Sequence, residues 1–197
     1  MAAVKLVSLT KEYQNGENYI RAVDDVSFSI KEGEFIAVIG ASGSGKSTLI
    51  NLISGLEKPT HGCVYVHDVN LTQLSLEEQI SFRRWHIGVV FQKYNLIPAM
   101  NVFENIVLPA KLLERTVDEK EVFHLAKTLG IEEKLFQMPD ELSGGQQQRA
   151  AIARAVYTHP TILEGTEKHT IFILALIKKK KSIRVFMILV DFLLDKI

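Results

Sequence analysis

Apolar and polar residues alternate over the first ten residues of the chain. Val4, Leu6 and Leu9 are separated by polar side chains such as Lys5 and Ser8. Because successive side chains of a strand point to opposite faces, this period of two predicts a β-strand with one buried face.

A second apolar stretch, residues 28–39, alternates at first and then becomes continuous. The turn residues Glu32 and Gly33 interrupt it, so the pattern predicts a hairpin that leads into a buried strand. This strand is the run FIAVI, and it stops at Gly40.

The segment at residues 46–54 has leucine or isoleucine at 49, 50, 52 and 53, which is helical spacing. Gly55 and then Pro59 end the helix that this spacing predicts. The chain therefore runs from a strand through a glycine-rich loop into a helix.

Further strands and helices alternate along the chain. Strands are expected at 63–66 and 87–91, and helices at 75–82, 118–129 and 150–156. Interleaved strands and helices predict an α/β domain.

Composition narrows the function classes. The length of 197 residues and the 47% apolar content fit one domain with a buried core. The 23 basic and 23 acidic residues balance, which removes the electrostatic reason to expect wholesale binding to nucleic acid or to an anionic membrane. Cys63 is the only cysteine, so we expect no disulfide partner, no cysteine-based metal site and a cytoplasmic location. The alternating start does not resemble a secretion leader.

Composition changes after residue 160. Residues 1–160 hold all five prolines and eleven of the twelve glycines, whereas 20 of the 37 residues at 161–197 are apolar. The apolar runs at 171–177 and 185–190 are each far shorter than the roughly 20 residues needed to cross a bilayer. We therefore expect one domain over 1–160 and an atypical tail over 161–197, without a membrane span.

The strongest local motif is GASGSGKS at residues 40–47, which fits the phosphate-loop pattern G-x-x-x-x-G-K-[ST]. It lies between a predicted strand and a predicted helix, as the motif requires. Glycines allow consecutive N–H groups to face a phosphate, and the helix N-terminus adds its positive dipole end. In such a loop Lys46 neutralises the β- and γ-phosphates, and the Ser47 hydroxyl binds Mg²⁺. The motif predicts nucleotide binding.

A second glycine-containing helix start is LSGGQQQR at residues 142–149. Ser143 and the N–H groups of Gly144 and Gly145 form another anion-binding helix end. With these two motifs the sequence resembles the nucleotide-binding subunits of ABC transporters, whose signature is LSGGQ. The resemblance implies a head-to-tail homodimer in which the signature of one subunit closes over the ATP held by the phosphate loop of the other.

The resemblance also implies particular site residues. Gln92 occupies the Q-loop position, where an amide reaches Mg²⁺ or the attacking water. Tyr13 occupies the position of an aromatic that stacks on adenine, a contact worth about 1 kcal/mol or more. Tyr19 is the alternative, and simple core packing remains possible for either tyrosine. Lys46 and Gln92 are the implied catalytic residues, and Ser47 and Gln92 the implied Mg²⁺ ligands. The implied ATP-binding residues are Tyr13, Gly40, Ser42, Gly43, Ser44, Gly45, Lys46, Ser47, Thr48, Ser143, Gly144, Gly145 and Gln146.

Several segments before residue 160, such as YIRAVDDVSFSI and FRRWHIGVVFQKYNLIPAM, are similar to the subgroup that drives lipoprotein release and the export of macrolides or antimicrobial peptides. The resemblance implies a P-loop NTPase core of ABC type, an N-terminal antiparallel β subdomain and a helical subdomain that carries the signature. It also implies a membrane permease as partner and a peripheral position on the inner face of the cell membrane. The loop at 96–102 is either the permease contact or a buried edge of the helical subdomain.

The catalytic part of the family pattern is missing. After ARAVYTHP the family continues with a strand that ends in Asp-Glu, then Pro-Thr, and later a strand that ends in a histidine, but this chain has TILEGTEKHT. Counting from Pro160 places Thr166 at the Mg²⁺-orienting aspartate and Glu167 at the general base. Loss of general-base catalysis typically lowers a rate by about 10²- to 10⁴-fold.

Three other residues bear on this region. We expect Glu164 and Gly165 to interrupt the strand, and His169 to be a solvated loop residue rather than the switch histidine. The break reflects natural divergence or a disrupted reading frame, and we favour the second because the change is abrupt and rich in Lys, Ile and Phe.

The break also affects the expected fold, whose C-terminal part is predicted to be incomplete. The missing strand neighbours the phosphate-loop strand, so its loss would leave unpaired backbone groups at a buried edge. The apolar runs at 169–177 and 183–190 are long enough to pair there, and they are also prone to aggregate.

Two functions remain open at this point. The leading one is an ATP-binding subunit that couples MgATP binding and hydrolysis to export. The alternative is an ATP-binding fragment or regulatory module that does not hydrolyse ATP.

Overall fold

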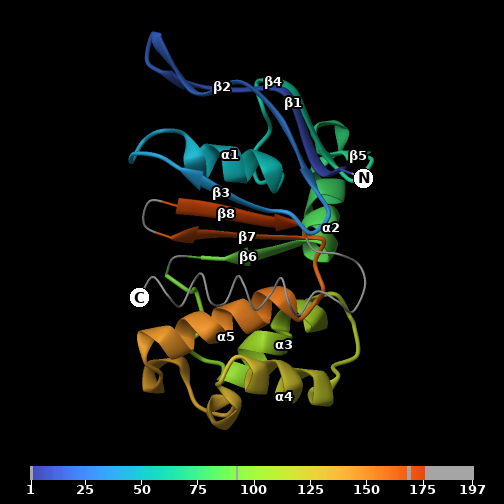
Figure 1. The fold of residues 1–197 in the computed structure, drawn as a ribbon, viewed down its shortest axis with the longest axis vertical. Helices are drawn as coiled ribbons and strands as arrows, with labels where there is room; N and C mark the ends of the chain where they lie inside the picture. The colour runs from blue at the N-terminus through green and yellow to red at the C-terminus, as the bar shows by residue number, and fades with distance from the viewer. Residues whose placement is uncertain (1, 92, 168–169, 176–197) are drawn as a thin grey trace.

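The computed structural model describes residues 2–91, 93–167 and 170–175 (Figure 1). For residues 166–167 and 170–175 it describes the backbone alone. Two sheets, one helix between them and a layer of helices beneath make up this part of the chain (Figure 1).

Sheet A is antiparallel throughout. The long strands β1 (Ala2–Asn15) and β2 (Asn18–Lys31) form a hairpin, and β4 (His61–Val66) and β5 (Val69–Asn70) extend it in the order β2-β1-β4-β5. The alternating pattern at the start of the chain therefore forms the strand it predicts. Sheet A is the expected N-terminal antiparallel β subdomain.

Sheet B carries the phosphate-loop strand. Its order is β3 (Phe35–Ile39), β8 (Thr170–Ala175), β7 (Ile162–Glu167) and β6 (Ile87–Val90). Strands β6 and β7 run parallel, whereas β8 is antiparallel to both β3 and β7. The domain is α/β as predicted, with a mixed sheet at its centre.

Two predictions about residues 28–39 are wrong. Strand β2 pairs with β1 in sheet A, whereas β3 joins sheet B, so no hairpin links them. The FIAVI strand is also not buried on both faces, because none of its residues is fully buried and Ile39 is 77% exposed; β3 lies at the edge of the described sheet. A short apolar run does not reveal how many neighbours its strand will have.

The expected interruption at Glu164 and Gly165 is also wrong. Both residues lie within β7, where Glu164 pairs with Val89 of β6 and Gly165 pairs with Val90. Pairing on both sides keeps the strand regular despite its unfavourable residues.

Strand β8 occupies the place beside β3 where the apolar runs were considered long enough to pair. Ile39 pairs with Thr170 and Phe35 with Leu174, so the apolar run at 169–177 supplies the pairing strand. The second run, 183–190, lies outside the described residues.

Five helices complete the described fold. Helix α1 (Lys46–Ile53) packs between the two sheets, and α2 (Leu76–His86) leads into β6 (Figure 1). Helices α3 (Val102–Leu112), α4 (Glu119–Thr128) and α5 (Gly144–Val156) cover the opposite face of sheet B. Short 3-10 turns lie at Leu71–Gln73, Glu132–Lys134 and Pro139–Glu141.

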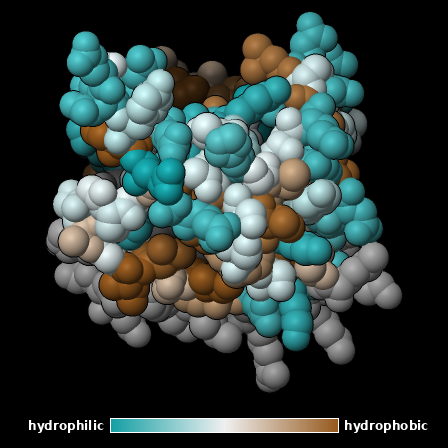
Figure 2. All heavy atoms as spheres, turned by 90° about the horizontal axis from the view of Figure 1, so that it is seen from above, coloured by the Kyte–Doolittle hydropathy of each residue, from teal (hydrophilic) through white to brown (hydrophobic). Residues whose placement is uncertain are grey.

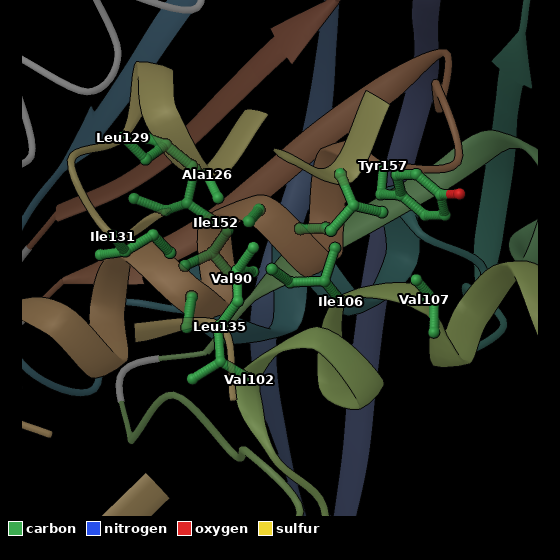
Figure 3. Close-up of a cluster of buried hydrophobic side chains, with 14 of the residues drawn as sticks. Val90, Val102, Ile106, Val107, Ala126, Leu129, Ile131, Leu135, Ile152 and Tyr157 are labelled. Atoms are coloured by element: carbon green, nitrogen blue, oxygen red, sulfur yellow. The ribbon is translucent and has the colours of Figure 1, made fainter. Parts of the chain in front are cut away.

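The core has one part on each face of sheet B. Ile162 of β7 packs with sheet A and α1, whereas the next residue, Leu163, packs with α3, α4 and α5. Successive residues of a strand point to opposite faces, so one strand serves both parts. Figure 3 shows the helical part, where Val90 of β6 lies among Ile106, Ile152 and Leu135.

Viewed from the end formed by the β1–β2 hairpin, the surface is mostly hydrophilic (Figure 2). No helix among the described residues is both long enough and apolar enough to span a membrane.

Candidate functional site

The phosphate loop lies between the end of β3 at Ile39 and the start of α1 at Lys46, as predicted. Gly45 caps the helix in the left-handed region, with φ of 82°, and a Cβ there would lie 2.0 Å from the carbonyl oxygen of Ala22. Gly43 is also left-handed, with φ of 79°. Residues 41–44 are exposed, so the loop is open to a ligand.

Lys46 places its charge inside this loop. Its Nζ donates hydrogen bonds to the carbonyl oxygens of Gly40 at 2.7 Å and Ala41 at 2.6 Å, and it lies 3.3 Å from Oγ of Ser44. Ser47, which follows, is exposed on the first turn of α1. A cation, a hydroxyl and a helix N-terminus therefore converge at one exposed loop, which suits a bound phosphate group.

An aromatic ring stands beside the same helix. The hydroxyl of Tyr13, on β1, donates to Oε2 of Glu57 at 2.5 Å and lies 3.5 Å from Oγ1 of Thr48 on α1. Burial and the neighbouring carboxylate raise the pKa of Tyr13. Tyr19 lies opposite Gln14 on the hairpin and is 67% exposed. Of the two tyrosines considered, Tyr13 is the one that contacts the phosphate-loop helix.

The signature segment caps α5. The Ser143 hydroxyl accepts a hydrogen bond from the Gln146 N–H at 3.4 Å, and the Gln146 side chain accepts one from the Ser143 N–H at 2.9 Å. This reciprocal capping box begins the helix at Gly144, earlier than the predicted start at 150. Ser143 and Gly144 are exposed, so this helix N-terminus is also open.

The two open helix starts do not face each other within the chain. Helix α1 lies on one face of sheet B and α5 on the other (Figure 1). A phosphate held by the loop before α1 is thus separated by the sheet from the signature of its own chain.

The segment after β6 is bound to α5 by Arg154. Its guanidinium donates to the carbonyl oxygens of Tyr94 at 2.7 Å and Asn95 at 2.6 Å. Both acceptor residues have positive φ, 59° and 47°, and burial lowers the pKa of Arg154. Sequence analysis missed this contact, since nothing local in the sequence marks two residues about 60 positions apart as partners. Gln92, which precedes this segment, lies outside the described residues.

The backbone of Glu167 ends β7 at the edge of the sheet where the phosphate loop begins. Glu167 pairs with Thr170 of β8, and Thr170 pairs with Ile39 of β3. Two strand spacings, about 10 Å, therefore separate the backbone of Glu167 from that of Ile39. The side chains of Thr166 and Glu167, and the whole of His169, lie outside the described part.

Comparisons with known proteins agree with the interpretation of these two helix starts as the phosphate loop and the signature. The family model described as "ABC transporter" matches residues 23–164. The chain belongs to the ABC transporter family. The predicted resemblance is thus confirmed, and the matched region includes both the phosphate loop and the signature.

Individual relatives cover most of the chain. It is 42% identical over 170 residues to the uncharacterized ABC transporter ATP-binding protein MJ0796 of Methanocaldococcus jannaschii, covering 83% of this chain and 72% of that protein. It is 43% identical over 161 residues to the methionine import ATP-binding protein MetN of Cutibacterium acnes, covering 81% of this chain. The match spans only 44% of MetN, less than half of that relative's length.

Among solved structures, the chain is similar to the MJ0796 cassette in a dimeric post-hydrolysis state bound to ADP and Pi. The TM-score is 0.77 at 39% identity, and the match covers 95% of this chain and 83% of the other. This similarity supports the predicted ABC-type fold.

The burial of one acidic residue, Glu164, was not predicted from the sequence. Glu164 is fully buried on β7, and neither carboxylate oxygen has a hydrogen-bond partner in the described part of the chain. Strand alternation places it on the same face as Ile162, toward α1. Burial raises the pKa of Glu164 to about 8, and nearby Ser54 opposes the shift. At neutral pH the carboxyl of Glu164 is therefore protonated in most of the folded protein molecules.

The described residues provide part of an Mg²⁺ site. Ser47 offers a hydroxyl beside the loop, but no cluster of three or more His, Cys, Asp or Glu side chains lies within the described ranges. Mg²⁺ is usually held by one or two carboxylates together with substrate phosphates. Phosphate oxygens and water would then add to the hydroxyl that Ser47 offers.

Proposed function

We propose that this chain is the ATP-binding subunit of an ABC export system and acts on a membrane permease from the cytoplasmic side. The observation that carries this proposal is the pair of exposed helix N-termini on opposite faces of sheet B. One holds the triphosphate of ATP in its own chain, and the other contacts the ATP of a second copy.

The residues of each helix start have assigned roles in this proposal. In the phosphate loop, Gly40, Ser42, Gly43, Ser44, Gly45, Lys46, Ser47 and Thr48 surround the phosphates, with Ser47 and Gln92 as Mg²⁺ ligands. Tyr13 stacks on the base. Ser143, Gly144, Gly145 and Gln146 of the partner copy close over the γ-phosphate.

The two signature glycines support the dimeric arrangement. A Cβ on Gly144 or Gly145 would meet no heavy atom within 4 Å among the described residues outside its own helix. Neither has a positive φ, and glycine in a helix costs about 0.5–1 kcal/mol relative to alanine. Within one chain, nothing described requires glycine there, whereas close approach of a second molecule would.

The export direction rests on the similarity of local segments to exporter subunits, whereas MetN, at comparable identity, is an importer subunit by its name.

In the loop at 96–102, Leu96 packs against the helical core and Val102 is buried, whereas Pro98 and Ala99 are exposed. We assign the permease contact to these two exposed residues.

A second candidate is an ATP-binding module that does not hydrolyse ATP. It is favoured by the segment after Pro160, TILEGTEKHT, which lacks the Asp-Glu pair of the family pattern. Thr166, at the position of the Mg²⁺-orienting aspartate, has no charge to offset that of the metal. Lys46, Gln92 and Glu167 are the catalytic candidates if hydrolysis occurs.

The experiment measures ATP binding, dimer formation and phosphate release by the full chain, with Lys46→Ala as control. We expect the wild type to bind MgATP and to form a nucleotide-dependent dimer, and Lys46→Ala to lose both. Failure of the folded wild type to bind ATP would overturn the proposal. Phosphate release above that of Lys46→Ala identifies an ATPase, and release equal to it identifies the binding module.

A further inference from the structure

A network of polar side chains connects β1 to the helix that carries the phosphate loop. Its centre is Glu57, in the loop after α1. Oε2 of Glu57 accepts the hydrogen bond from the Tyr13 hydroxyl at 2.5 Å, and Oε1 accepts one from Nδ2 of Asn51 at 3.1 Å. Both carboxylate oxygens are therefore used, one toward β1 and the other toward α1.

Lys11 completes the network. Its ammonium lies 3.8 Å from Oε2 of Glu57 and 5.1 Å from the centre of the Tyr13 ring, and it donates to the carbonyl oxygen of Lys58 at 2.8 Å. The cation covers one face of the ring, so a flat partner has to stack on the other face or displace it.

The charges favour this arrangement at neutral pH. Burial acts to raise the pKa of Glu57, but the hydrogen bonds from Tyr13 and Asn51 and the charge of Lys11 outweigh it, so that pKa is lowered. Glu57 thus remains a carboxylate, and a hydrogen bond to an ionised acceptor is stronger than one between neutral groups.

Tyr13 needs such an anchor because its strand belongs to sheet A, whereas the phosphate loop follows a strand of sheet B. The hydroxyl of Tyr13 is held by Glu57 within 3.5 Å of Thr48, two residues after Lys46. The contact therefore fixes the ring relative to the helix that presents the phosphates.

We propose that Glu57 is a positioning residue for nucleotide binding: it holds the Tyr13 ring at the distance from the phosphate loop that lets one nucleotide span both. This inference rests on the proposed function, in which Tyr13 stacks on the base. Glu57 itself touches neither base nor phosphate and acts through the Tyr13 hydroxyl. Its effect is to order the ring before binding, which removes part of the entropic cost of association.

The test compares two ligands, MgATP and inorganic tripolyphosphate, which has the phosphates without a base. Glu57→Ala is expected to weaken ATP binding about three- to tenfold, as for the loss of one preordered side chain. Binding of tripolyphosphate should stay unchanged, because the phosphate loop is intact. Glu57→Gln retains an acceptor oxygen and should restore most of the preference for ATP.

Tyr13→Phe provides the matched variant, since it keeps the ring and removes the hydroxyl. It should reproduce the loss seen for Glu57→Ala, and the double variant should lose no more than either single one. Independent losses that add in the double variant would contradict the proposal, as would equal weakening of both ligands or no change in ATP binding by Glu57→Ala. If the folded wild type bound tripolyphosphate but not ATP, the inference would fail while a phosphate site remained. Binding of neither ligand would overturn the proposed function and this inference with it.

Discussion

Glu164 and Asn105 are buried on opposite faces of sheet B, and they differ in how their polar atoms are satisfied. On the α1 face, the carboxyl of Glu164 is fully buried without a hydrogen-bond partner among the described residues. On the helical face, Asn105 is equally buried, but its Oδ1 accepts from the Ile97 N–H at 2.7 Å and its Nδ2 donates to three carbonyl oxygens. A buried polar group without a partner costs about 1–3 kcal/mol, a cost that Glu164 carries and Asn105 avoids.

The glycines at the two helix starts show a second difference. Gly45 is required by its own chain, because its φ is positive and a Cβ would collide with the backbone of Ala22. Gly144 and Gly145 meet no such demand. The start of α1 is thus constrained from within its own chain, whereas the start of α5 has open space around its glycines. Changes in the first region should reduce folding stability, and changes in the second should affect association.

The largest expected effect concerns Glu164. Its pKa is about 8 in the folded chain against an ordinary value of 4.5, so the folded state holds an extra proton between these values. The contribution of this proton to the unfolding free energy is complete below pH 4.5 and is lost as the pH rises through 8. The expected decrease is on the order of 3 kcal/mol from pH 5 to 8. Urea unfolding at a series of pH values measures this slope.

Glu164→Gln is the control, because it removes the titrating group and keeps the shape. Its unfolding free energy should lack the decrease between pH 5 and 8, and Glu164→Leu should exceed the wild type at pH 8. An unchanged slope in Glu164→Gln would show that the carboxyl is paired or hydrated in the folded protein.

The next effect concerns Gly45. Gly45→Ala introduces a methyl group 2.0 Å from the Ala22 carbonyl oxygen in left-handed backbone, and should lower the unfolding free energy by about 2–3 kcal/mol. Gly43→Ala has the same backbone strain with no neighbour within 4 Å, so its loss should be smaller, about 1–2 kcal/mol. Equal losses, measured by urea unfolding, would mean that the contact with Ala22 is not decisive.

Sequence patterns predicted what is local in this fold. The alternation near Leu6 gave β1, the spacing of Ile50 and Leu52 gave α1, and the GKS segment gave the strand, loop and helix order. These features depend on neighbouring residues, whose preferences are present in any short window.

Pairing and contact across the chain were not predictable in the same way. The position of β3 at the described edge depends on β8, more than 130 residues later, and β7 stays regular through Glu164 because strands pair on both sides. The family motif identified Tyr13 but not its anchor Glu57, which lies 44 residues away and belongs to no motif. Such contacts arise from tertiary packing, which overrides local preference.

The smallest expected effect has the opposite sign and tests the signature helix. Gly144→Ala adds a methyl group into open space at the first turn of α5 and should raise the unfolding free energy of the isolated chain by up to about 1 kcal/mol. The same methyl group would occupy the space that a second copy needs, so the ATP-dependent dimer should weaken while ATP binding to the monomer is unchanged. Analytical ultracentrifugation with and without MgATP measures the dimer. Ser143→Ala is the comparison variant, because it removes the helix-capping hydroxyl without filling the space beside Gly144. It should lower the unfolding free energy by about 1 kcal/mol. A Gly144→Ala chain that dimerises as well as the wild type would show that the open space at this helix start has no part in association.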